Sequence, residues 1–459
     1  MVGGSDAGIS AALRARELEP STEVEVVLAD EHPNLSICGL PYYVSGEVSP
    51  WQALAHRTRQ DLHAAGMGLR TSTRAVGVDV AARRLAVRRP DGQVEDLAYD
   101  ELVVGTGAVP VRPALAGADD LGPADGVHLL RTMDDALALT ADLDGRPVRS
   151  VAVVGAGYIG LEMAEALTTR GLDVVLLSRP PEVLATLDPP LGALVRAELV
   201  AHGVEVLVAT TATGLARRSG RLRVDAAGPD GPLHRDVDLV LVVAGVRPDV
   251  DLLVRAGATT GAGGAVVVDR SMATGLPHVR AAGDCVVTHH QLLGTTWAPL
   301  GTTAHKQGRV AGAAAVGHHA RYAGSLGTQV VKVFDVVAAR TGLLDHEAEA
   351  AGLRPLTTQV EADDHKAYYP GAQRVHARVT GDLHDRRLLG AQLVGRLSSE
   401  VSRRIDVVAA ALAAGTSVAG VNDLDLSYTP PLGSPWDVIQ TAAQHWEHTA
   451  RARHAPQPA

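Results

Sequence analysis

The chain has 459 residues, more than one hydrophobic core usually serves, so we expect two or three domains. Its net charge of −10 excludes a non-specific nucleic-acid binder, because no basic block offsets the acidic residues. No apolar run reaches the roughly 18 residues that span a bilayer, and no secretory signal opens the chain, so we expect no membrane segment. Two cysteines cannot build a disulfide framework, which favours a reducing, cytoplasmic setting. No metal site is expected.

A glycine-rich turn at residues 3–8 opens the chain, and a helix is expected over 9–18. A strand over 24–29 follows and ends at Asp30, which lies 22 residues after the last glycine of the turn. Dinucleotide-binding folds place a ribose-binding carboxylate about 20 residues after such a turn. Because Ser5 replaces one glycine of the G-x-G-x-x-G motif, a plain glycine-rich β-turn is the alternative.

Only Met1 and Val2 precede this turn, whereas a central parallel strand needs about five residues. We therefore expect that the true start of the protein lies upstream of Met1. The alternative is a domain that has lost most of its first strand.

Cys38 lies in residues 36–43, directly after this first nucleotide-binding unit. A thiol placed there can exchange electrons with the cofactor of that unit. At a helix N-terminus the thiolate is stabilised by free backbone N–H groups, which makes the thiol more reactive. Further on, an apolar strand over 102–104 runs into the small-residue turn Gly105-Thr106-Gly107. Such a turn lets the backbone approach a ligand closely, so we expect a second contact with the dinucleotide.

The strongest signal is a strand over 151–154 that leads into a complete G-x-G-x-x-G motif at 155–160 and then a helix. The glycines permit a tight turn and close approach of a pyrophosphate to the helix N-terminus. The next strand ends at Ser178-Arg179, where an NAD-selective site usually carries a carboxylate. Serine and arginine can bind a 2′-phosphate, so NADPH is favoured over NADH. The alternative is that Arg179 is a solvated surface charge. Two nucleotide units in one chain suggest a flavin and a nicotinamide facing each other.

After Gly324 the pattern changes to strands over 329–336, 374–379 and 388–394 and a long helix over 398–414. This predicts an antiparallel α+β unit without a nucleotide motif, which favours a role in an interface. The end of the chain, from about residue 451 with Pro456 and Pro458, is expected to be disordered.

Together these segments resemble the pyridine nucleotide–disulfide oxidoreductases, in their single-cysteine branch and nearest to coenzyme A disulfide reductase, with NADH oxidases and peroxidases as relatives. The resemblance covers nearly the whole chain. It is carried by the turn at 3–8 with Asp30, Cys38-Gly39-Leu40-Pro41-Tyr42, Gly105-Thr106-Gly107, 155–162, 245–248, 283–284, 299–303, 332–334, 339–342, 368–371 and 428–431.

This resemblance implies an α/β fold with two Rossmann-like dinucleotide-binding domains and a C-terminal α+β dimerisation domain. An FAD domain would comprise 1–113 and 245–320, an NAD(P)H domain 114–244, a dimerisation domain 321–446 and a disordered tail 447–459. A homodimer is implied, and the partner subunit would bring Tyr428, with Tyr368 or Tyr369, to Cys38.

The resemblance also implies residue roles. Glu162 would face the contact between nicotinamide and flavin, Tyr158 would cover the flavin until the nicotinamide arrives, and Asp284 would bind the ribityl chain. Arg14, Arg16 and Tyr42 fall at substrate positions. FAD and NADPH, with NADH as the alternative, would contact Gly3, Gly8, Asp30, Gly105, Thr106, Gly107, Asp284, Thr302, Gly155, Gly157, Tyr158, Ile159, Gly160, Ser178, Arg179 and Gly245.

Cys38 has no resolving cysteine nearby, because Pro33 and Tyr43 stand five residues away on either side. It must therefore cycle as a mixed disulfide with a small thiol or as a sulfenic acid. Oxidases and peroxidases of the resembled branch typically carry a histidine in the first glycine turn, which this chain lacks, whereas the tyrosine expected in the disulfide reductase is present as Tyr428. The resemblance therefore favours a disulfide reductase. The alternatives are an NAD(P)H oxidase or peroxidase and a flavin-containing, redox-controlled binding protein. Coenzyme A disulfide is one candidate substrate; the short run Ser36-Ile37-Cys38 also admits another low-molecular-weight disulfide or a persulfide.

Overall fold

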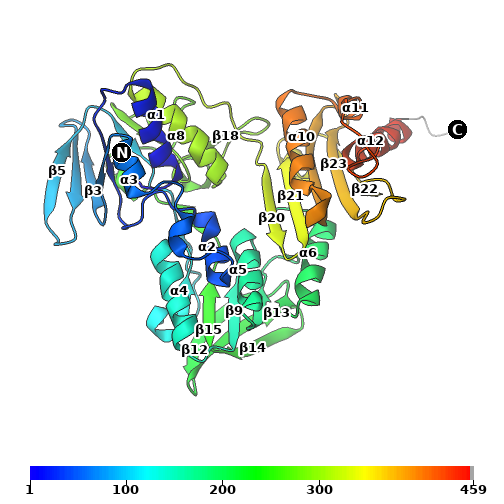
Figure 1. Ribbon diagram of the computed structural model, residues 1–459, viewed down its shortest axis with the longest axis horizontal. Helices are drawn as coiled ribbons and strands as arrows, with labels where there is room; N and C mark the ends of the chain where they lie inside the picture. The colour runs from blue at the N-terminus through cyan, green and yellow to red at the C-terminus, as the bar shows by residue number, and fades with distance from the viewer. Residues whose placement is uncertain (455–459) are drawn as a thin grey trace. The chain divides into compact units, whose positions relative to one another are not determined.

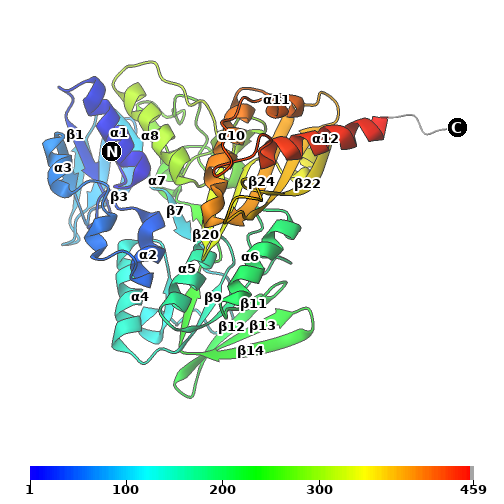
Figure 2. The same cartoon turned by 45° about the vertical axis from the view of Figure 1, so that its right-hand side comes forward.

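The computed structural model describes residues 1–454 (Figures 1 and 2), and the chain forms two compact units. Unit 1 joins the stretches Met1–Arg112, Leu129–Gly145 and Gly245–Ser325. Unit 2 joins Pro113–His128, Arg146–Ala244 and Leu326–Ala459. Each unit therefore gathers segments that lie far apart in the sequence.

A parallel arrangement of short strands forms the centre of unit 1. β1 pairs with β2, β6 pairs with β17, and Val2 connects both pairs through parallel bridges to Val27 and Val104. Val2 thus joins the two pairs directly before the first glycine turn. Val26 and Val103 are 0% exposed, so these strands form a buried core. The strands are β1 (Val24–Val27), β2 (Met67–Arg70), β6 (Leu102–Val104) and β17 (Val279–Ala281).

Two helices of unit 1, α1 (Asp6–Leu18) and α8 (Gly301–Ala315), lie side by side against these strands (Figure 1). A Cβ at Gly308 would lie 2.3 Å from the carbonyl oxygen of Ala7, and one at Gly312 would lie 2.1 Å from that of Ala11. Only glycine permits backbones to approach so closely. This contact fixes the start of α1, and with it the first glycine turn, against α8.

The remaining elements of unit 1 include the short helix α2, which begins just after Cys38 and packs against α4. β3, β4 and β5 form an antiparallel sheet, while β7 pairs with β16 and β18 with β19. The bounds are α2 (Leu40–Ser45), α3 (Arg59–Ala64), α4 (Met133–Gly145), α7 (Asp251–Arg255), β3 (Arg74–Asp79), β4 (Arg84–Arg88), β5 (Val94–Ala98), β7 (Ala108–Pro110), β16 (Val246–Pro248), β18 (Thr288–His290), β19 (Gly294–Thr296) and the 3-10 turns η1 (Ile37–Gly39), η2 (Trp51–Leu54) and η4 (Ala262–Gly264).

Unit 2 contains the second nucleotide-binding pattern as a five-stranded sheet with the order β11-β10-β9-β15-β8. The central strand β9 pairs in parallel with β10 and β15 and leads through the glycine turn into α5. β12, β13 and β14 form a separate antiparallel sheet. The bounds are β8 (Val127–Leu129), β9 (Ser150–Val154), β10 (Asp173–Leu177), β11 (Glu205–Leu207), β12 (Thr211–Arg218), β13 (Arg221–Gly228), β14 (Gly231–Val237), β15 (Leu239–Val242), α5 (Tyr158–Thr169), α6 (Pro189–Ala201) and η3 (Pro123–Asp125).

The C-terminal part of unit 2 is an antiparallel sheet with the order β20-β21-β24-β23-β22, accompanied by α9 to α12. The predicted α/β fold class with an α+β C-terminal unit is therefore confirmed. The bounds are β20 (Gln329–Val333), β21 (Val336–Gly342), β22 (Pro355–Asp363), β23 (Arg374–Asp382), β24 (Leu388–Arg396), α9 (Asp345–Ala350), α10 (Val401–Ala413), α11 (Val418–Asn422), α12 (Val438–His454) and η5 (Leu397–Ser399).

The expected disordered tail of 447–459 is wrong for residues 447–454, which continue α12. This helix is anchored by two fully buried side chains, Trp446 and Ala450, both 0% exposed. The indole N–H of Trp446 also donates to the Leu356 carbonyl oxygen at 2.6 Å. Burial of an apolar face holds the last turns in place although the sequence there is polar. Residues 455–459 lie outside the described part of the chain.

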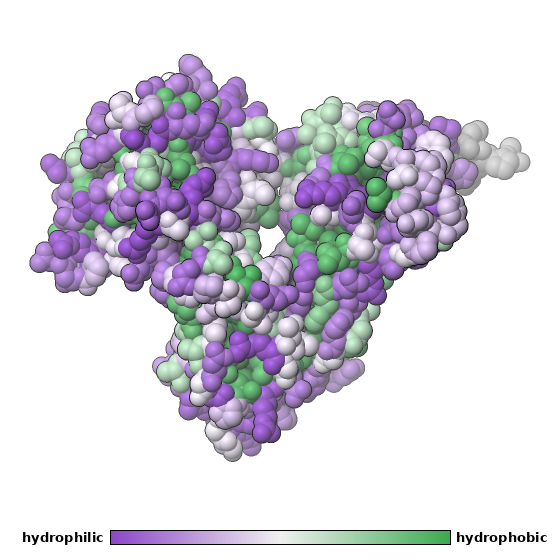
Figure 3. All heavy atoms as spheres, viewed as in Figure 1, coloured by the Kyte–Doolittle hydropathy of each residue, from purple (hydrophilic) through white to green (hydrophobic). Residues whose placement is uncertain are grey.

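Hydrophilic and hydrophobic side chains are mixed over the visible face of each unit (Figure 3). Among the described residues, no helix combines the length and apolar character needed to cross a bilayer.

Candidate functional site

Cys38 lies in the 3-10 turn η1, directly before α2, and its side chain is exposed. The segment that carries it is tied to residues further along the chain. Leu35 forms an antiparallel bridge with Ala55, and the Ser36 N–H donates to the Leu54 carbonyl oxygen at 2.8 Å. The thiol is therefore held on an anchored turn where a dissolved substrate can reach it.

The other cysteine, Cys285, is 0% exposed. Its sulfur lies 3.4 Å from the Ala282 carbonyl oxygen and 3.7 Å from that of Val104. Burial raises the pKa of the Cys285 thiol above its ordinary value. A buried thiol of this kind behaves as a small apolar side chain, so the two cysteines are suited to different tasks.

The three glycines of the first unit pack tightly against one another. A Cβ at Gly3 would lie 2.1 Å from the Gly105 carbonyl oxygen, and one at Gly8 would lie 2.0 Å from that of Gly3. Gly3 also has a φ of +104°, a conformation that side chains rarely permit. These contacts close the turn against the 105–107 segment at the N-terminus of α1. The arrangement fits the pyrophosphate of a dinucleotide, whose charge a helix N-terminus favours.

Two carboxylates of unit 1 stand where the sequence places FAD contacts. Asp30 follows β1 and accepts a hydrogen bond from the His32 N–H at 2.8 Å. Asp284 follows β17, with its Oδ2 3.5 Å from the Arg131 guanidinium. Burial raises the pKa of both carboxyls, and at Asp284 the Arg131 charge acts in the opposite direction. Arg131 carried no signal in the sequence, because its partner is 153 residues away.

The remaining predicted contacts of the first nucleotide also belong to unit 1. The Thr106 hydroxyl donates to the Asp249 carbonyl oxygen at 2.6 Å. Gly107 and Gly245 have φ values of +75° and +111°, so both turns need glycine. Thr302 is exposed in the first turn of α8.

The second glycine turn, between β9 and α5, combines two crowded glycines with one open position. A Cβ at Gly155 would lie 2.4 Å from the Val243 carbonyl oxygen, and one at Gly160 would lie 1.9 Å from that of Gly155. At Gly157 a Cβ would meet no heavy atom of the described chain within 4 Å. This open position is the one where a dinucleotide can approach the backbone. Ile159, the next predicted contact, is partly buried in the first turn of α5.

At the end of β10 the two predicted 2′-phosphate ligands differ in exposure. Ser178 is 1% exposed, and its hydroxyl donates to the Glu182 carbonyl oxygen at 3.1 Å. Arg179 is exposed. Of the two, only Arg179 presents its polar group to solvent.

Tyr158 and Glu162 stand one turn apart at the start of α5. The Thr186 hydroxyl lies 3.3 Å from the Tyr158 hydroxyl, and burial raises the pKa of that phenol. The pKa of Glu162 is raised to about 7, first by burial and then by the charge of Glu165, while Lys332 opposes the shift. A carboxyl whose pKa lies near 7 can gain or lose a proton under physiological conditions, and such shifted pKa values are typical of functional sites.

Two of the tyrosines that the resemblance brings to Cys38, the catalytic candidate Tyr428 and the substrate-binding candidate Tyr368, lie close to each other. Tyr368 and Tyr428 of unit 2 are 73% and 45% exposed, and their hydroxyls interact with each other. Tyr369 is 43% exposed beside them in the chain.

The predicted substrate residues of unit 1 have different surroundings. Arg14 forms a 2.8 Å ion pair with Glu17. The Arg16 guanidinium instead donates to backbone carbonyls of Pro20, Thr22 and Ala65, which ties the end of α1 to its neighbours. Tyr42 is partly buried in α2.

A polar cluster at the start of α1 escaped sequence analysis. The Nε2 of His305 lies 3.3 Å from an Asp6 oxygen, and its Nδ1 lies 2.9 Å from the Ser10 hydroxyl. The His56 ring is 6.4 Å from the His305 ring, on the segment paired with that of Cys38. Ser10 and His305 are 295 residues apart, so no local pattern could join them.

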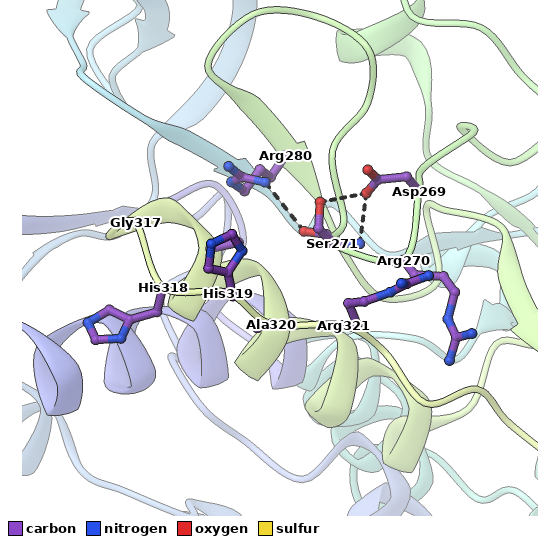
Figure 4. A pocket seen from close by; sticks show the side chains of 10 residues that line it. Asp269, Arg270, Ser271, Arg280, Gly317, His318, His319, Ala320 and Arg321 are labelled. Atoms are coloured by element: carbon purple, nitrogen blue, oxygen red, sulfur yellow. Dashed lines mark hydrogen bonds between the residues drawn. The ribbon is translucent and has the colours of Figure 1, made fainter.

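A cavity of about 910 Å³ in unit 1 lies away from all these residues, at the end of α8 (Figure 4). Figure 4 shows Arg280 directed toward Ser271, whose hydroxyl donates to Asp269. None of the site residues predicted from the sequence lines it. Within residues 1–454 no cluster of histidine, cysteine and acidic side chains suits a metal ion.

Comparison with known proteins gives sequence matches along almost the whole chain. It is 34% identical to the NAD(P)H sulfur oxidoreductase (CoA-dependent) of Pyrococcus furiosus, over 96% of this chain and 97% of that protein. It is 31% identical to an NADH oxidase of Methanocaldococcus jannaschii, over 97% of each. It is 26% identical to the coenzyme A disulfide reductase of Staphylococcus haemolyticus, over 96% of this chain and 97% of that protein.

Among solved structures, the fold is similar to that of an NAD-dependent persulfide reductase from A. fulgidus. The TM-score is 0.93 at 32% identity, covering 98% of this chain and 83% of that one.

Residues 1–308 match the family described as pyridine nucleotide-disulphide oxidoreductase, and residues 328–438 match the dimerisation domain of the same family. With two glycine turns shaped for dinucleotides and relatives that align from end to end, the chain belongs to the pyridine nucleotide-disulphide oxidoreductases, which use FAD and NAD(P)H.

Proposed function

We propose that this protein is an FAD-dependent NAD(P)H:disulfide reductase that acts on a low-molecular-weight disulfide or persulfide through a mixed disulfide at Cys38. The exposed Cys38, on an anchored turn next to the first nucleotide unit, is the observation that carries the proposal. The buried Cys285 cannot take that role without unfolding its surroundings.

In the proposed reaction the Cys38 thiolate attacks one sulfur of the substrate disulfide and expels the other as a thiolate, which takes up one proton to become the first thiol and leaves a mixed disulfide at Cys38. Two electrons and one proton then cleave that mixed disulfide into the Cys38 thiolate and the second thiol. Overall, NAD(P)H, one proton and one disulfide give NAD(P)⁺ and two thiols. When bound, FAD would carry an electron pair from the nicotinamide to the sulfur.

The two glycine turns, at 3–8 and at 155–160, indicate which residues would hold the cofactors. Gly3, Gly8 and Gly105 would receive the FAD pyrophosphate, with Asp30 at a ribose hydroxyl and Asp284 at the ribityl chain. Gly155, Gly157 and Gly160 would receive that of NAD(P)H. Tyr158 and Glu162 would stand beside the nicotinamide, because both belong to the first turns of α5.

In a homodimer, the pair Tyr368 and Tyr428 would serve the Cys38 of the other subunit. A phenol can donate a proton to a leaving thiolate, and the contact between the two hydroxyls supplies a second group to orient the first. Their exposure is consistent with a site that a second subunit completes.

The relatives support a sulfur substrate, since two of their names specify coenzyme A with sulfur or disulfide reduction and the similar structure is a persulfide reductase. Arg14 is the basic residue of α1 that we assign to substrate phosphates, because the Arg16 guanidinium is already bound to backbone carbonyls. The similarity to an NADH oxidase supports a second candidate function, an NAD(P)H oxidase or peroxidase in which Cys38 cycles as a sulfenic acid.

Mass spectrometry of the purified, unreduced protein tests the substrate class. A mixed disulfide with a small thiol on Cys38 is the expected result, and a mass increase equal to coenzyme A would name it. One added oxygen would favour the oxidase or peroxidase instead. The stoichiometry of turnover gives the same distinction: two thiols per NAD(P)H for a reductase, against oxygen or peroxide consumed.

We further propose that NADPH is the preferred nucleotide and that Arg179 selects it. Replacing Arg179 with alanine is expected to lower kcat/KM for NADPH about tenfold or more, because a charge-assisted contact to the 2′-phosphate is lost. NADH lacks that phosphate, so its kcat/KM is expected to stay within about twofold. A clear preference of the unmodified enzyme for NADH would overturn the assignment.

A further inference from the structure

The tip of the β20–β21 hairpin in unit 2 is docked onto α5, the helix that follows the second nucleotide turn, and onto α6. Phe334 at the tip has a φ of +51°, which bulky residues adopt rarely. Its ring stacks on His202 at the end of α6, with ring centroids 3.7 Å apart and planes 3° apart. The Asp335 N–H donates to a Glu198 oxygen of α6 at 3.4 Å. A strained backbone persists only where surrounding contacts hold it, so the tip is fixed.

Glu165 of α5 is the point where this hairpin meets the nucleotide-binding half of unit 2. The side chain is buried, with the residue 8% exposed. Lys332 of β20 forms an ion pair with one of its oxygens, and the Phe334 N–H donates to the other at 2.8 Å. Both oxygens of Glu165 are therefore bound by the C-terminal sheet.

Glu162 lies three residues before Glu165, so both carboxyls face the same side of α5. β9, β10 and β20 are the strands with the most extensive contact to α5, and of these three β20 brings a charge that acts on Glu162, that of Lys332. On α5 itself Glu165 acts on Glu162, and the Tyr158 phenol lies one turn earlier, under the influence of Arg340 from β21. The two charges that act on Glu162 thus oppose each other.

We propose that Lys332 and Glu165 are positioning residues that set the charge of Glu162, and so make the C-terminal sheet a regulator of the nicotinamide end of α5. This inference rests on the proposed function for the placing of the nicotinamide. A charged Glu162 stabilises the positive ring of oxidised nicotinamide, whereas a protonated Glu162 does not. The Lys332–Glu165 pair would therefore set the pH range in which the oxidised nucleotide is retained or released.

Two substitutions that break the same ion pair test this inference, because they are expected to act in opposite directions. Lys332→Met removes the positive charge, which should raise the pH midpoint of Glu162 titration. Glu165→Gln removes the negative charge, which should lower it. Each shift is expected to be about one pKa unit or more, as for other charges that lie close to a carboxyl. A merely structural loss would change both variants in the same direction.

The midpoint is measured on the oxidised holoenzyme with ¹³C-labelled glutamate by NMR, and Glu162→Gln identifies the signal. The pH dependence of NADP⁺ affinity, followed by calorimetry, should shift in parallel. Lys332→Arg is the matched control: it keeps the positive charge, so the midpoint of Glu162 titration should stay at its value in the unmodified enzyme. Equal or absent shifts in Lys332→Met and Glu165→Gln would overturn the inference.

Failure of the proposed function would be seen separately. Opposite shifts of the Glu162 signal without any shift in NADP⁺ affinity would overturn the role at the nicotinamide, because the charge would then act elsewhere. Absence of thiol release from every disulfide, with both shifts present, would contradict the reductase and leave the inference standing. Thermal unfolding of each variant confirms that a folded protein is compared.

Discussion

Replacing Cys38 with serine is expected to abolish thiol release from a disulfide substrate, with a loss in kcat of at least about 10³-fold. A serine hydroxyl is a weak nucleophile at neutral pH and cannot form a disulfide, so the proposed mixed disulfide has no atom on which to form. The nucleotide turns lie elsewhere in the chain and remain intact. NADPH-dependent bleaching of the flavin should therefore persist, and stopped-flow absorbance measures it beside a thiol assay.

Cys285→Ala is the matched control for this experiment. Its side chain is 0% exposed, and its sulfur contacts the backbone carbonyl oxygens of Ala282 and Val104, which stay in place when the thiol is removed, so turnover should stay within about twofold of the unmodified enzyme. A modest loss of stability from the small cavity, about 1 kcal/mol, is compatible with that outcome. Thiol release that survives in Cys38→Ser, or that disappears in Cys285→Ala, would contradict the assignment of Cys38.

The nucleotide turns were predictable because their signals are local. The turn at 155–160 needs only a strand, three glycines and a helix in sequence, and the contacts of Gly155 and Gly160 follow from that spacing. By contrast, the ion pair that we propose to set the charge of Glu162 joins distant residues. Lys332 and Glu165 are 167 residues apart, and a lysine in a strand or a glutamate in a helix is ordinary in isolation.

Exposure was also beyond the reach of the sequence. Ser178 and Arg179 carry the same weight as predicted phosphate ligands, yet one is buried with its hydroxyl bound and the other is exposed. In α12 the sequence-based expectation of disorder was wrong for residues 447–454. A polar, proline-ended segment reads as disordered, but the burial of Trp446 and Ala450 stabilises the helix through residue 454. Tertiary packing, which a single sequence does not display, decided both cases.

Substitutions at two glycines of the turn at 155–160 are also expected to have large effects, one on stability and the other on nucleotide binding. Gly160→Ala places a Cβ 1.9 Å from the Gly155 carbonyl oxygen, so α5 must move away from the turn. Overpacking against backbone of this kind costs about 3 kcal/mol, and Tm should fall by several degrees. Calorimetric unfolding of the holoenzyme measures the change.

Gly157→Ala should leave the fold unchanged but impair nucleotide binding. A Cβ there meets no heavy atom of the described residues within 4 Å, so Tm should stay within about 1 °C. The methyl group would occupy the space through which the pyrophosphate approaches the backbone, and KM for NADPH should rise at least about tenfold. The contrast separates a glycine needed by the protein from one needed by the ligand. Normal NADPH binding in Gly157→Ala would mean that the pyrophosphate does not approach this turn, and the position proposed for Glu162 beside the nicotinamide would be lost with it.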